Sequence, residues 1–471
     1  MARAVFAGLG ILLALFFGSI AVTGFLLQTR PVITNVVVIT ADTLRADHVS
    51  SYGYFAPTTP NIDRFAEEGI LFTNAFSQIP HTPPSHWSIF TGLYPFRHGM
   101  FTPKDNGSGL QTLPGILKEK GYVTAGFVSS QMLNGFAGEF DYFNSEEGKE
   151  RVKTRQQAAD TTEKALSWLR KHWKKKFFLW IHYFDPHSPY NPPEGYDIFN
   201  YSTGTHYTDA RYSMTGLSKQ RTIREDIGRY DGEIRYMDEN IGKVLGTLKE
   251  LGADGNTVVL IVSDHGECFG EHNFSDFGYD KKGPCVFHGK TLYDEEVHVP
   301  LILRIPSFPK GLRIEETVET VDVFPTLLEI LGIKAPENNG KRLVPLIEGG
   351  KGKGYAFMQT RSRRGLPSMG IRTQEWKYVK MVPSGFDLET DMIEQEGGPA
   401  GNPEENGSLA GKVLLLNMTE GEKRNFIGAE RETADMLEKK LGEIVSSGMK
   451  YRTVEIDTET EKLLKSLGYI E

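Results

Sequence analysis

The chain has 471 residues, of which 39% are hydrophobic and 24% are charged, and its formal net charge is -8. This length suffices for one large domain with an appendage, and the apolar and charged fractions are ordinary for a globular protein. The negative charge argues against a nucleic-acid partner, because nucleic-acid binding usually requires a basic surface.

The first 30 residues differ in composition from the rest. Residues 4–27 form a run of roughly 24 positions without a charged side chain, and about 20 apolar residues span a bilayer as a helix. Residues 1–30 are therefore predicted to be a membrane anchor. Arg3 and the terminal amine favour a cytoplasmic N-terminus, which places the remaining chain in the periplasm or outside the cell. A cleaved signal peptide, which would release a secreted protein, is the alternative.

The next segment has the pattern of a buried strand. Val36–Ile39 is a continuous apolar run that ends close to a carboxylate, Asp42. Such runs are typical of parallel strands that are buried on both faces. Ligands of open α/β sheets bind outside the carboxyl ends of the strands, so Asp42 is predicted at the ligand-binding edge.

A second candidate site residue begins a helix. Thr82 precedes two prolines and an apolar-periodic segment. Proline fits the first turn of a helix, so Thr82 is predicted at a helix N-terminus, where the dipole and free N–H groups favour an anion or an alkoxide. His86 lies one turn later on the same side. Two alternatives stay open for His86: contact with Thr82, or a place on the helix surface.

Strands and helices alternate along the middle of the chain. Apolar runs predict strands at 125–130, 177–181, 257–262 and 297–305. Capping residues predict helices after Thr59 and Thr112, and helical periodicity predicts a long amphipathic helix over 225–251. The alternation predicts an α/β fold with a central sheet and helices on both faces. Residues 191–224 have no sustained period and are predicted to form a loop over the active-site mouth.

Polar side chains follow the strand at 257–262. Asp264 and His265 come directly after it, and carboxylate and imidazole ligands suit a Mn²⁺ or Zn²⁺ ion. In contrast, Asp231 and Asp238 form one polar face of the long helix, which we interpret as structural. The two cysteines, Cys268 and Cys285, share one polar loop. In an oxidising compartment a disulfide would close about 16 residues and stabilise the fold by on the order of 3 kcal/mol; two unpaired thiols are the alternative.

The segment 82–92 resembles the sulfatase signature of the alkaline phosphatase superfamily, which has Cys or Ser, any residue, Pro, Ser and Arg, and then Thr-Gly. The matching residues are Pro84, Ser85, Thr91 and Gly92. Thr82 stands where sulfatases carry the Cys or Ser that becomes formylglycine, and His86 stands in place of Arg. Since Thr cannot follow that route, no formylglycine is expected, and a Thr nucleophile resembles the phosphoryl-transferring branches.

The resemblance extends over nearly everything from residue 33 onward and implies an alkaline phosphatase-like fold with a mixed, mostly parallel sheet. It assigns one divalent metal ion to Asp42, Thr82, Asp264 and His265. Sulfatases usually carry Asn at the position of His265, paired with Ca²⁺, and a second Asp at the position of Ala41. Both departures favour Mn²⁺ or Zn²⁺, with Ca²⁺ or Mg²⁺ as alternatives.

The resemblance also assigns residues to the substrate. His187 matches a position that binds the ester oxygen or protonates the leaving group, and Lys290 matches a lysine that contacts the anionic ester. His288 is predicted to bind substrate, or a second metal, and His86 to bind substrate. His182 and Asp185 could support a second metal. Sulfatases usually carry Lys and His at the positions of Ser129 and Gln131, so this pocket is predicted to be less cationic.

The pattern of predicted elements changes after about residue 350. Short strands are predicted at 355–358, 368–372, 376–382 and 412–416, followed by a helix at 434–445. This part resembles the small C-terminal subdomain of sulfatases, which implies an antiparallel sheet with one helix. The predicted division is a catalytic domain at 31–350 and an α+β subdomain at 351–471.

Together these features predict a metal-dependent, sulfatase-like hydrolase that acts on phosphoesters through Thr82. Coordination to a divalent cation would lower the pKa of the Thr82 hydroxyl and make it a better nucleophile. The ester is a monoester or diester of a small molecule, lipid or glycan, and transfer to an acceptor alcohol is an option. The alternatives are a sulfuric ester hydrolase and a catalytically inactive binding protein of the same fold.

Overall fold

The computed structural model describes residues 32–201, 221–273, 284–360, 368–381 and 413–449, apart from residues 102, 146 and 154. The predicted membrane segment at 4–27 lies outside these residues, as does part of the predicted loop at 191–224. Among the helices that the structure describes, none combines the length and the hydropathy that crossing a membrane requires.

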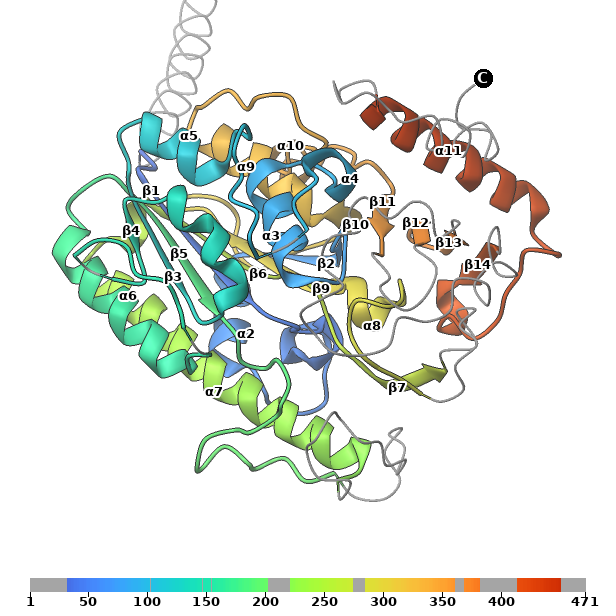
Figure 1. Cartoon of the computed structure of the whole chain (residues 1–471), viewed down its shortest axis with the longest axis horizontal. Helices are drawn as coiled ribbons and strands as arrows, with labels where there is room; N and C mark the ends of the chain where they lie inside the picture. Colours follow the sequence, from blue (N-terminus) through green and yellow to red (C-terminus); the bar gives the residue numbers. More distant parts are fainter. Residues whose placement is uncertain are drawn as a thin grey trace, which may run out of the picture.

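A central sheet of eight strands organises the molecule (Figure 1). Its strands are β1 (Asn35–Ala41), β2 (Ile70–Phe76), β3 (Val123–Val128), β4 (Tyr142–Phe143), β5 (Phe177–Tyr183), β6 (Thr257–Ser263), β9 (His298–Arg304) and β10 (Leu312–Glu319). They lie in the order β10-β2-β9-β6-β1-β5-β3-β4, and only β9 runs antiparallel to its neighbours β2 and β6. The predicted mixed, mostly parallel sheet is confirmed.

Strand β1 lies near the middle of this sheet, and all of its residues are buried. Its side chains point alternately into two hydrophobic cores, one on each face, which explains its apolar run without polar alternation. Ala41 at the end of β1 pairs with Tyr183 of β5 and with Ser263 of β6. The carboxyl ends of these three strands therefore lie level at one edge.

Helices cover both faces of the sheet, as predicted (Figure 1). One core packs against α2 (Pro60–Glu67), α6 (Ala158–His172) and α7 (Ile223–Glu250). The other packs against α3 (Thr82–Thr91), α5 (Leu113–Glu119), α9 (Val323–Ile330) and α10 (Val344–Ile347). Short helices are α4 (Pro95–His98), α8 (Asp294–Val297), and the 3₁₀ turns η1 (Ala46–His48), η2 (Ser50–Tyr52), η3 (Gln131–Gly138), η4 (Asp254–Asn256), η5 (Thr320–Asp322) and η7 (Met418–Glu420). Thr112 caps α5 through Gly115 N, as expected.

Pro300 lies inside the antiparallel strand β9. The pairing of β9 with β2 shifts register between Phe72 and Ala75, which is the stretch opposite Pro300, and the pairing with β6 ends at Leu301. A proline has no N–H to give to a ladder and is tolerated at such irregularities. The strand predicted at 297–305 is thus confirmed despite its proline.

Asp238, on the polar face of the long helix α7, has a structural role at the start of α2. Asp238 is fully buried, and its carboxylate accepts hydrogen bonds from Asn61 N at 3.0 Å and Ile62 N at 2.8 Å, at the start of α2. Thr59, which precedes α2, makes no side-chain cap of its own. The carboxylate of α7 therefore supplies the acceptor that the first turn of α2 needs.

Replacing Asp238 with Ala should lower the free energy of unfolding by about 2–3 kcal/mol, because buried N–H donors lose their acceptor. Urea denaturation measures this, and Glu250→Ala, at an exposed position on the same helix, should change the value by less than about 0.5 kcal/mol. Asp238→Asn keeps one acceptor oxygen and should lie between them. An Asp238→Ala midpoint equal to that of the parent would refute the capping role.

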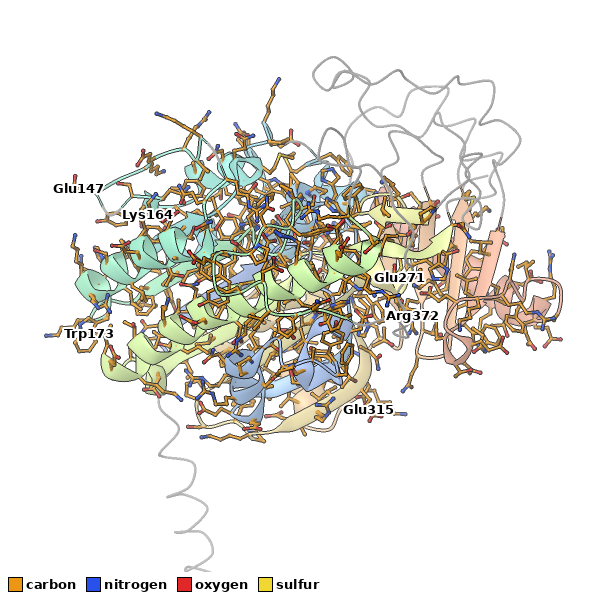
Figure 2. All side chains as sticks on the ribbon, turned by 90° about the horizontal axis from the view of Figure 1, so that it is seen from below. Glu147, Lys164, Trp173, Glu271, Glu315 and Arg372 are labelled. Carbon is orange, nitrogen blue, oxygen red and sulfur yellow. The ribbon has the colours of Figure 1, made fainter. Side chains whose placement is uncertain are left out.

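Two smaller sheets complete the described chain. The C-terminal one has β11 (Ala356–Gln359), β12 (Ser368–Arg372), β13 (Trp376–Met381) and β14 (Val413–Asn417), all antiparallel, and packs against α11 (Arg431–Met449). This confirms the predicted antiparallel sheet with one helix. The second is the hairpin β7 (Cys268–Asn273) and β8 (Pro284–Phe287). Figure 2 shows one end of α7 near the labelled Glu271 of β7. The labelled Arg372 of the C-terminal sheet lies on the same side of the molecule.

Candidate metal centre and active site

Three buried side chains meet at the carboxyl edge of the sheet. Asp42 follows β1, and Asp264 and His265 follow β6; all three are fully buried. His265 Nε2 lies 3.7 Å from Asp42 Oδ1 and 3.5 Å from Asp264 Oδ2. One ligand atom from each of the three residues falls within 4.8 Å of the others. Strand ends that are level in the sheet thus bring together residues far apart in the sequence.

Thr82 joins this cluster from helix α3, which begins at that residue as predicted. Its Oγ1 lies 3.4 Å from both carboxylate oxygens of Asp42 and 3.3 Å from His265 Nε2. The four predicted metal ligands therefore surround one point. The structure thus brings the four side chains together, and their binding of a metal ion stays a prediction.

The residues that match the sulfatase signature hold α3 in this place. Ser85 Oγ donates to the carbonyl oxygen of Asp264 at 2.7 Å, which fastens the first turn of α3 to the end of β6. Gly92 ends the helix with φ +67°, and a Cβ there would come within 2.8 Å of Phe324 Cδ1. The position requires glycine both for its left-handed conformation and for this close approach.

The electrostatics of the cluster favour a bound cation. Burial raises the pKa of Asp264, and the neighbouring Asp42 carboxylate raises it further. Burial would also raise the pKa of Asp42, but the nearby His182, His187 and His265 bring it well below its usual range. Burial lowers the pKa of His265, so its imidazole is neutral. Asp264 Oδ2 has no hydrogen-bond partner among the described residues. Two carboxylates, a neutral imidazole and a hydroxyl fit a divalent ion of the Mn²⁺ or Zn²⁺ type.

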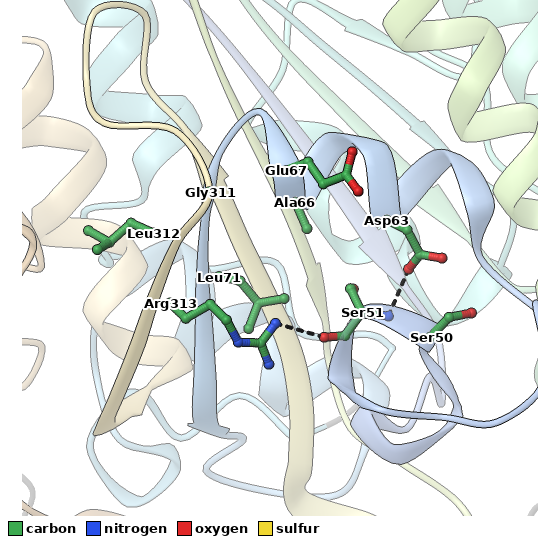
Figure 3. A pocket seen from close by; sticks show the side chains of 9 residues that line it. All are labelled: Ser50, Ser51, Asp63, Ala66, Glu67, Leu71, Gly311, Leu312 and Arg313. Atoms are coloured by element: carbon green, nitrogen blue, oxygen red, sulfur yellow. Dashed lines mark hydrogen bonds between the residues drawn. The ribbon is translucent and has the colours of Figure 1, made fainter.

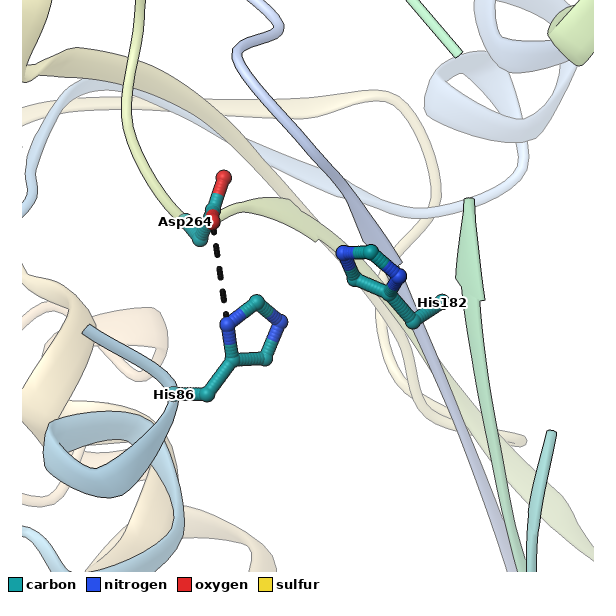
Figure 4. A group of neighbouring side chains, drawn as sticks. All are labelled: His86, His182 and Asp264. Carbon is teal, nitrogen blue, oxygen red and sulfur yellow. Dashed lines mark ion pairs between the residues drawn. The ribbon is translucent and has the colours of Figure 1, made fainter. Parts of the chain in front are cut away.

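Two further histidines, His86 and His182, lie near Asp264 of this cluster (Figure 4). His86 is fully buried; its Nδ1 lies 2.8 Å from the carbonyl oxygen of Thr82, and its Nε2 lies 3.1 Å from Thr40 Oγ1. Both ring nitrogens are thus engaged inside the protein. His86 is therefore not a helix-surface residue, and its contact with Thr82 is with the backbone carbonyl oxygen and not with the hydroxyl. Its assignment as a substrate-binding residue stays a prediction.

His182 is the site residue that the sequence analysis undervalued. It is fully buried near the end of β5, its Nε2 lies 3.5 Å from Asp42 Oδ2, and neither ring nitrogen has a hydrogen-bond partner within the described ranges. His86, His182 and Asp264 can also bring one ligand atom each within 4.8 Å. Asp185, which we paired with His182, instead lies 3.9 Å from Arg155. The sequence signal that could have identified His182 is its position directly after the apolar run that predicts a strand at 177–181.

Replacing His182 with Leu should weaken binding of Mn²⁺ or Zn²⁺ about 10–100-fold, because His182 Nε2 lies 3.5 Å from Oδ2 of Asp42, a predicted metal ligand. Calorimetric titration of the full chain with each ion measures this. His172→Leu is a matched control, since His172 is also buried but bonds to Trp168 O in α6. Equal affinities in the two variants would show that His182 has no part in positioning Asp42.

Two more histidines, His187 and His288, extend the cluster from His265 through ring contacts. The rings of His265 and His288 have centroids 4.4 Å apart, and those of His288 and His187 are 5.0 Å apart. His288 Nδ1 lies 3.0 Å from Oε1 of Glu267, which is fully buried. Lys290 Nζ donates to Val286 O at 2.8 Å. The structure thus brings His187 and His288 to the predicted site, and gives Lys290 a backbone partner in β8.

A separate pocket lies between α2, η2 and the start of β10 (Figure 3). Its lining residues are Ser50, Ser51, Asp63, Ala66, Glu67, Leu71, Gly311, Leu312 and Arg313. Two hydrogen bonds cross it, from Arg313 Nη1 to Ser51 O at 3.0 Å and from Ser51 N to Asp63 Oδ1 at 2.8 Å. It contains none of the predicted catalytic or metal-binding residues.

The fold and the site together define a class of protein, namely an α/β fold that places a helix-borne threonine hydroxyl beside buried carboxylates and a histidine at the carboxyl edge of its sheet. The chain belongs to the sulfatase family: the family described as "Sulfatase" matches residues 34–333. A second description, "N-sulphoglucosamine sulphohydrolase, C-terminal", matches residues 284–397. The predicted family is confirmed, and the chain is a sulfuric or phosphoric ester hydrolase. This family normally uses a divalent metal.

Known proteins of the family are distant but extensive matches. The chain is similar to an arylsulfatase of Clostridium perfringens, with 25% identity over 67% of this chain and 78% of the relative. It is also similar to arylsulfatase K of Bos taurus, with 23% identity over 83% of each chain.

Solved structures confirm the fold. A protein determined in complex with its substrate D-glucosamine-2-N,6-O-disulfate has a TM-score of 0.71 at 20% identity, over 90% of this chain and 100% of that chain. The phosphonate monoester hydrolase of Agrobacterium radiobacter has a TM-score of 0.68 at 19% identity, over 90% of this chain and 98% of that chain.

Proposed function

We propose that this chain hydrolyses sulfate esters of a carbohydrate, with Thr82 as a direct nucleophile. The observation that carries the proposal is the position of Thr82 Oγ1, within 3.4 Å of Asp42 and His265. Named relatives support the ester and the sugar, since they include arylsulfatases and an N-acetylglucosamine-6-O-sulfatase of Bacteroides thetaiotaomicron. The phosphoester preferred from the sequence becomes the second candidate.

The described residues can divide the chemistry between them. The Thr82 oxygen forms a bond to the sulfur while the bond from sulfur to the leaving alcohol oxygen breaks, and water later cleaves the Thr82 ester. Asp42, Asp264 and His265 would hold a divalent cation with Thr82. When bound, such an ion lowers the pKa of the hydroxyl and stabilises negative charge on the ester oxygens. We propose Mn²⁺ or Zn²⁺ as the ion, and no formylglycine.

Two histidines are proposed to serve the leaving group differently. Burial lowers the pKa of His187, so its neutral ring suits binding of an ester oxygen. Burial also acts to lower the pKa of His288, but the Glu267 carboxylate outweighs it and the pKa is raised. His288 is therefore the better proton donor near neutral pH. Lys290 stays a proposed contact of the anionic ester.

A specific observation favours the phosphoester as second candidate. Sulfatases usually carry cations at the positions of Ser129 and Gln131, and here Ser129 Oγ is bonded to Thr161 Oγ1 at 2.8 Å and to His182 O. This serine is buried in the fold and adds no positive charge. A less cationic pocket suits a monoanion better than a dianion. Phosphodiesters, phosphonate monoesters and sulfate esters are monoanions, so the pocket disfavours only a phosphate monoester. The proposed threonine nucleophile is the feature that favours a phosphodiester or phosphonate over a sulfate ester, because it resembles the phosphoryl-transferring branches of the superfamily.

Parallel assays with an aryl sulfate, a phosphate monoester, a phosphodiester and a phosphonate monoester test the proposal. The sulfate ester should have the largest kcat/KM. A dominant phosphodiester or phosphonate rate would replace the first candidate with the second. Absence of turnover on all four substrates and on sulfated oligosaccharides, in protein loaded with Mn²⁺ or Zn²⁺, would favour the binding-protein alternative.

We also propose that residues 4–27 anchor the chain in the membrane with the catalytic domain outside the cytoplasm. Extraction of membranes with alkaline carbonate tests this. Anchored protein should stay with the membranes, and its N-terminal peptide should be present. Release in a shortened form would indicate a cleaved signal peptide instead.

A further inference from the structure

We propose that Cys268 and Cys285 form a reversible disulfide, a covalent modification site that ties β7 to β8 beside the candidate active site. Both residues are free thiols in this structure, and both are buried, with 1% and 0% exposure. Together they form a small buried cluster of their own. The proposal concerns the covalent state of the hairpin and does not depend on the substrate.

The register of the hairpin brings the two thiols together. Cys268 lies opposite Phe287, and Cys285 is two residues from Phe287 on the same strand. Since alternate residues of a strand share a face, both cysteines point to the same side of the ribbon. Their sulfur atoms lie within 4.8 Å of each other. A disulfide therefore requires only a small approach of two side chains that already meet.

A carboxylate beside the thiols raises the competing possibility of a metal site. Glu296 Oε1 lies 3.4 Å from Cys268 Sγ. However, this carboxylate already accepts hydrogen bonds from Thr291 N at 3.0 Å, Thr291 Oγ1 at 2.7 Å and Lys290 N at 3.1 Å. Its oxygens are satisfied within the fold and do not call for a cation. Both thiols also donate to Glu296 Oε1, at 3.4 Å from Cys268 and 3.9 Å from Cys285, so this oxygen is already used within the fold. This favours the disulfide over a zinc ion.

The position of the pair gives the bond a structural consequence. Cys268 directly follows Glu267, and Cys285 precedes His288 by three residues, while Glu267 and His288 are joined at 3.0 Å. The hairpin itself is weakly paired, because its ladder shifts register between Phe269 and Asn273. A covalent bond would hold β7, which Glu267 directly precedes, against β8, which leads to His288.

The chemistry balances with a disulfide oxidant. The thiolate of one cysteine attacks the oxidant, which leaves a mixed disulfide and releases one thiol. The second cysteine then attacks the mixed disulfide, which forms the Cys268–Cys285 bond and releases the second thiol. The protein loses two hydrogen atoms and two electrons, and the oxidant gains them. Burial of both thiols predicts that the reaction is slow and follows local opening of the hairpin.

Incubation of the full chain with oxidised glutathione, followed by denaturation, alkylation and peptide mass mapping, tests the proposal. The expected product is one cross-linked peptide pair, with neither cysteine alkylated until a reductant is added. The oxidised protein should also melt about 3 °C above the reduced protein, from the loop-closure effect in a chain of this size.

A double Cys268→Ala, Cys285→Ala variant is the matched control, and its melting temperature should not respond to reductant. Single variants keep one thiol and should give at most a glutathione adduct. Two cysteines that remain open to alkylation after oxidation would overturn the proposal, as would one equivalent of zinc that is present in the parent and absent from the double variant. These readouts are independent of turnover, so they fail or succeed separately from the proposed function.

Discussion

Replacing Thr82 with Ala is expected to lower kcat by about 10⁴-fold or more, with little change in KM or in melting temperature. In the proposed mechanism the hydroxyl oxygen forms the covalent bond, and this Oγ1 lies 3.3 Å from His265 Nε2 and 3.4 Å from both Asp42 oxygens. Steady-state kinetics on the sulfate ester proposed above measure the effect.

Two further substitutions separate the chemistry from the packing. Thr82→Val keeps the branched shape and should lose as much activity as Thr82→Ala, whereas Thr82→Ser keeps the hydroxyl and should stay within about tenfold of the parent. Rapid quenching followed by mass spectrometry should find an ester on residue 82 in the parent and in Thr82→Ser. Unchanged turnover in Thr82→Val would show that the nucleophile is another group.

Removal of the divalent ion is expected to abolish turnover, and Mn²⁺ or Zn²⁺ should restore it. Binding should also raise stability, by about 2.7 kcal/mol at a metal concentration of 100 times Kd. The physical reason is that Asp42 and Asp264 are both fully buried and face the same His265 nitrogen. Without a cation between them, burial and the neighbouring Asp42 carboxylate raise the pKa of Asp264, which makes its charged form unfavourable.

The Asp264→Asn variant sharpens this test because its two effects have opposite signs. It should bind metal far more weakly and lose turnover, since one charged ligand is gone. In the absence of metal, however, it should be at least as stable as the metal-free parent, because one of two neighbouring buried carboxylates has been neutralised. Thermal melting with and without metal measures both. A metal-free variant that is clearly less stable than the metal-free parent would contradict the electrostatic account.

Much of the architecture follows from local pattern. The apolar run at 36–39, the capping threonine at 112 and the periodicity of 225–251 each predict an element that the structure contains as β1, α5 and α7. The reversal of β9 does not follow from its own residues, because an apolar run has no direction. Its partners β2 and β6 set that direction.

The short signature also predicts the helix that carries Thr82, but not how that helix is held. Ser85 reaches the carbonyl oxygen of Asp264 across 179 positions of sequence, and only the packed sheet brings the two together. The same holds for His182, whose closeness to Asp42 depends on β5 lying next to β1.

The family, the mostly parallel sheet, the C-terminal sheet with its helix, and the candidate metal-binding and nucleophilic residues can all be predicted from the amino-acid sequence. These depend on local periodicity and on residue chemistry, which a linear chain displays directly. Which residues meet depends on the packed structure: Thr82 with Asp42 and His265, Glu267 with His288, and one cysteine with the other. Distances between side chains on different elements depend on strand order and register, and these arise when the whole sheet packs.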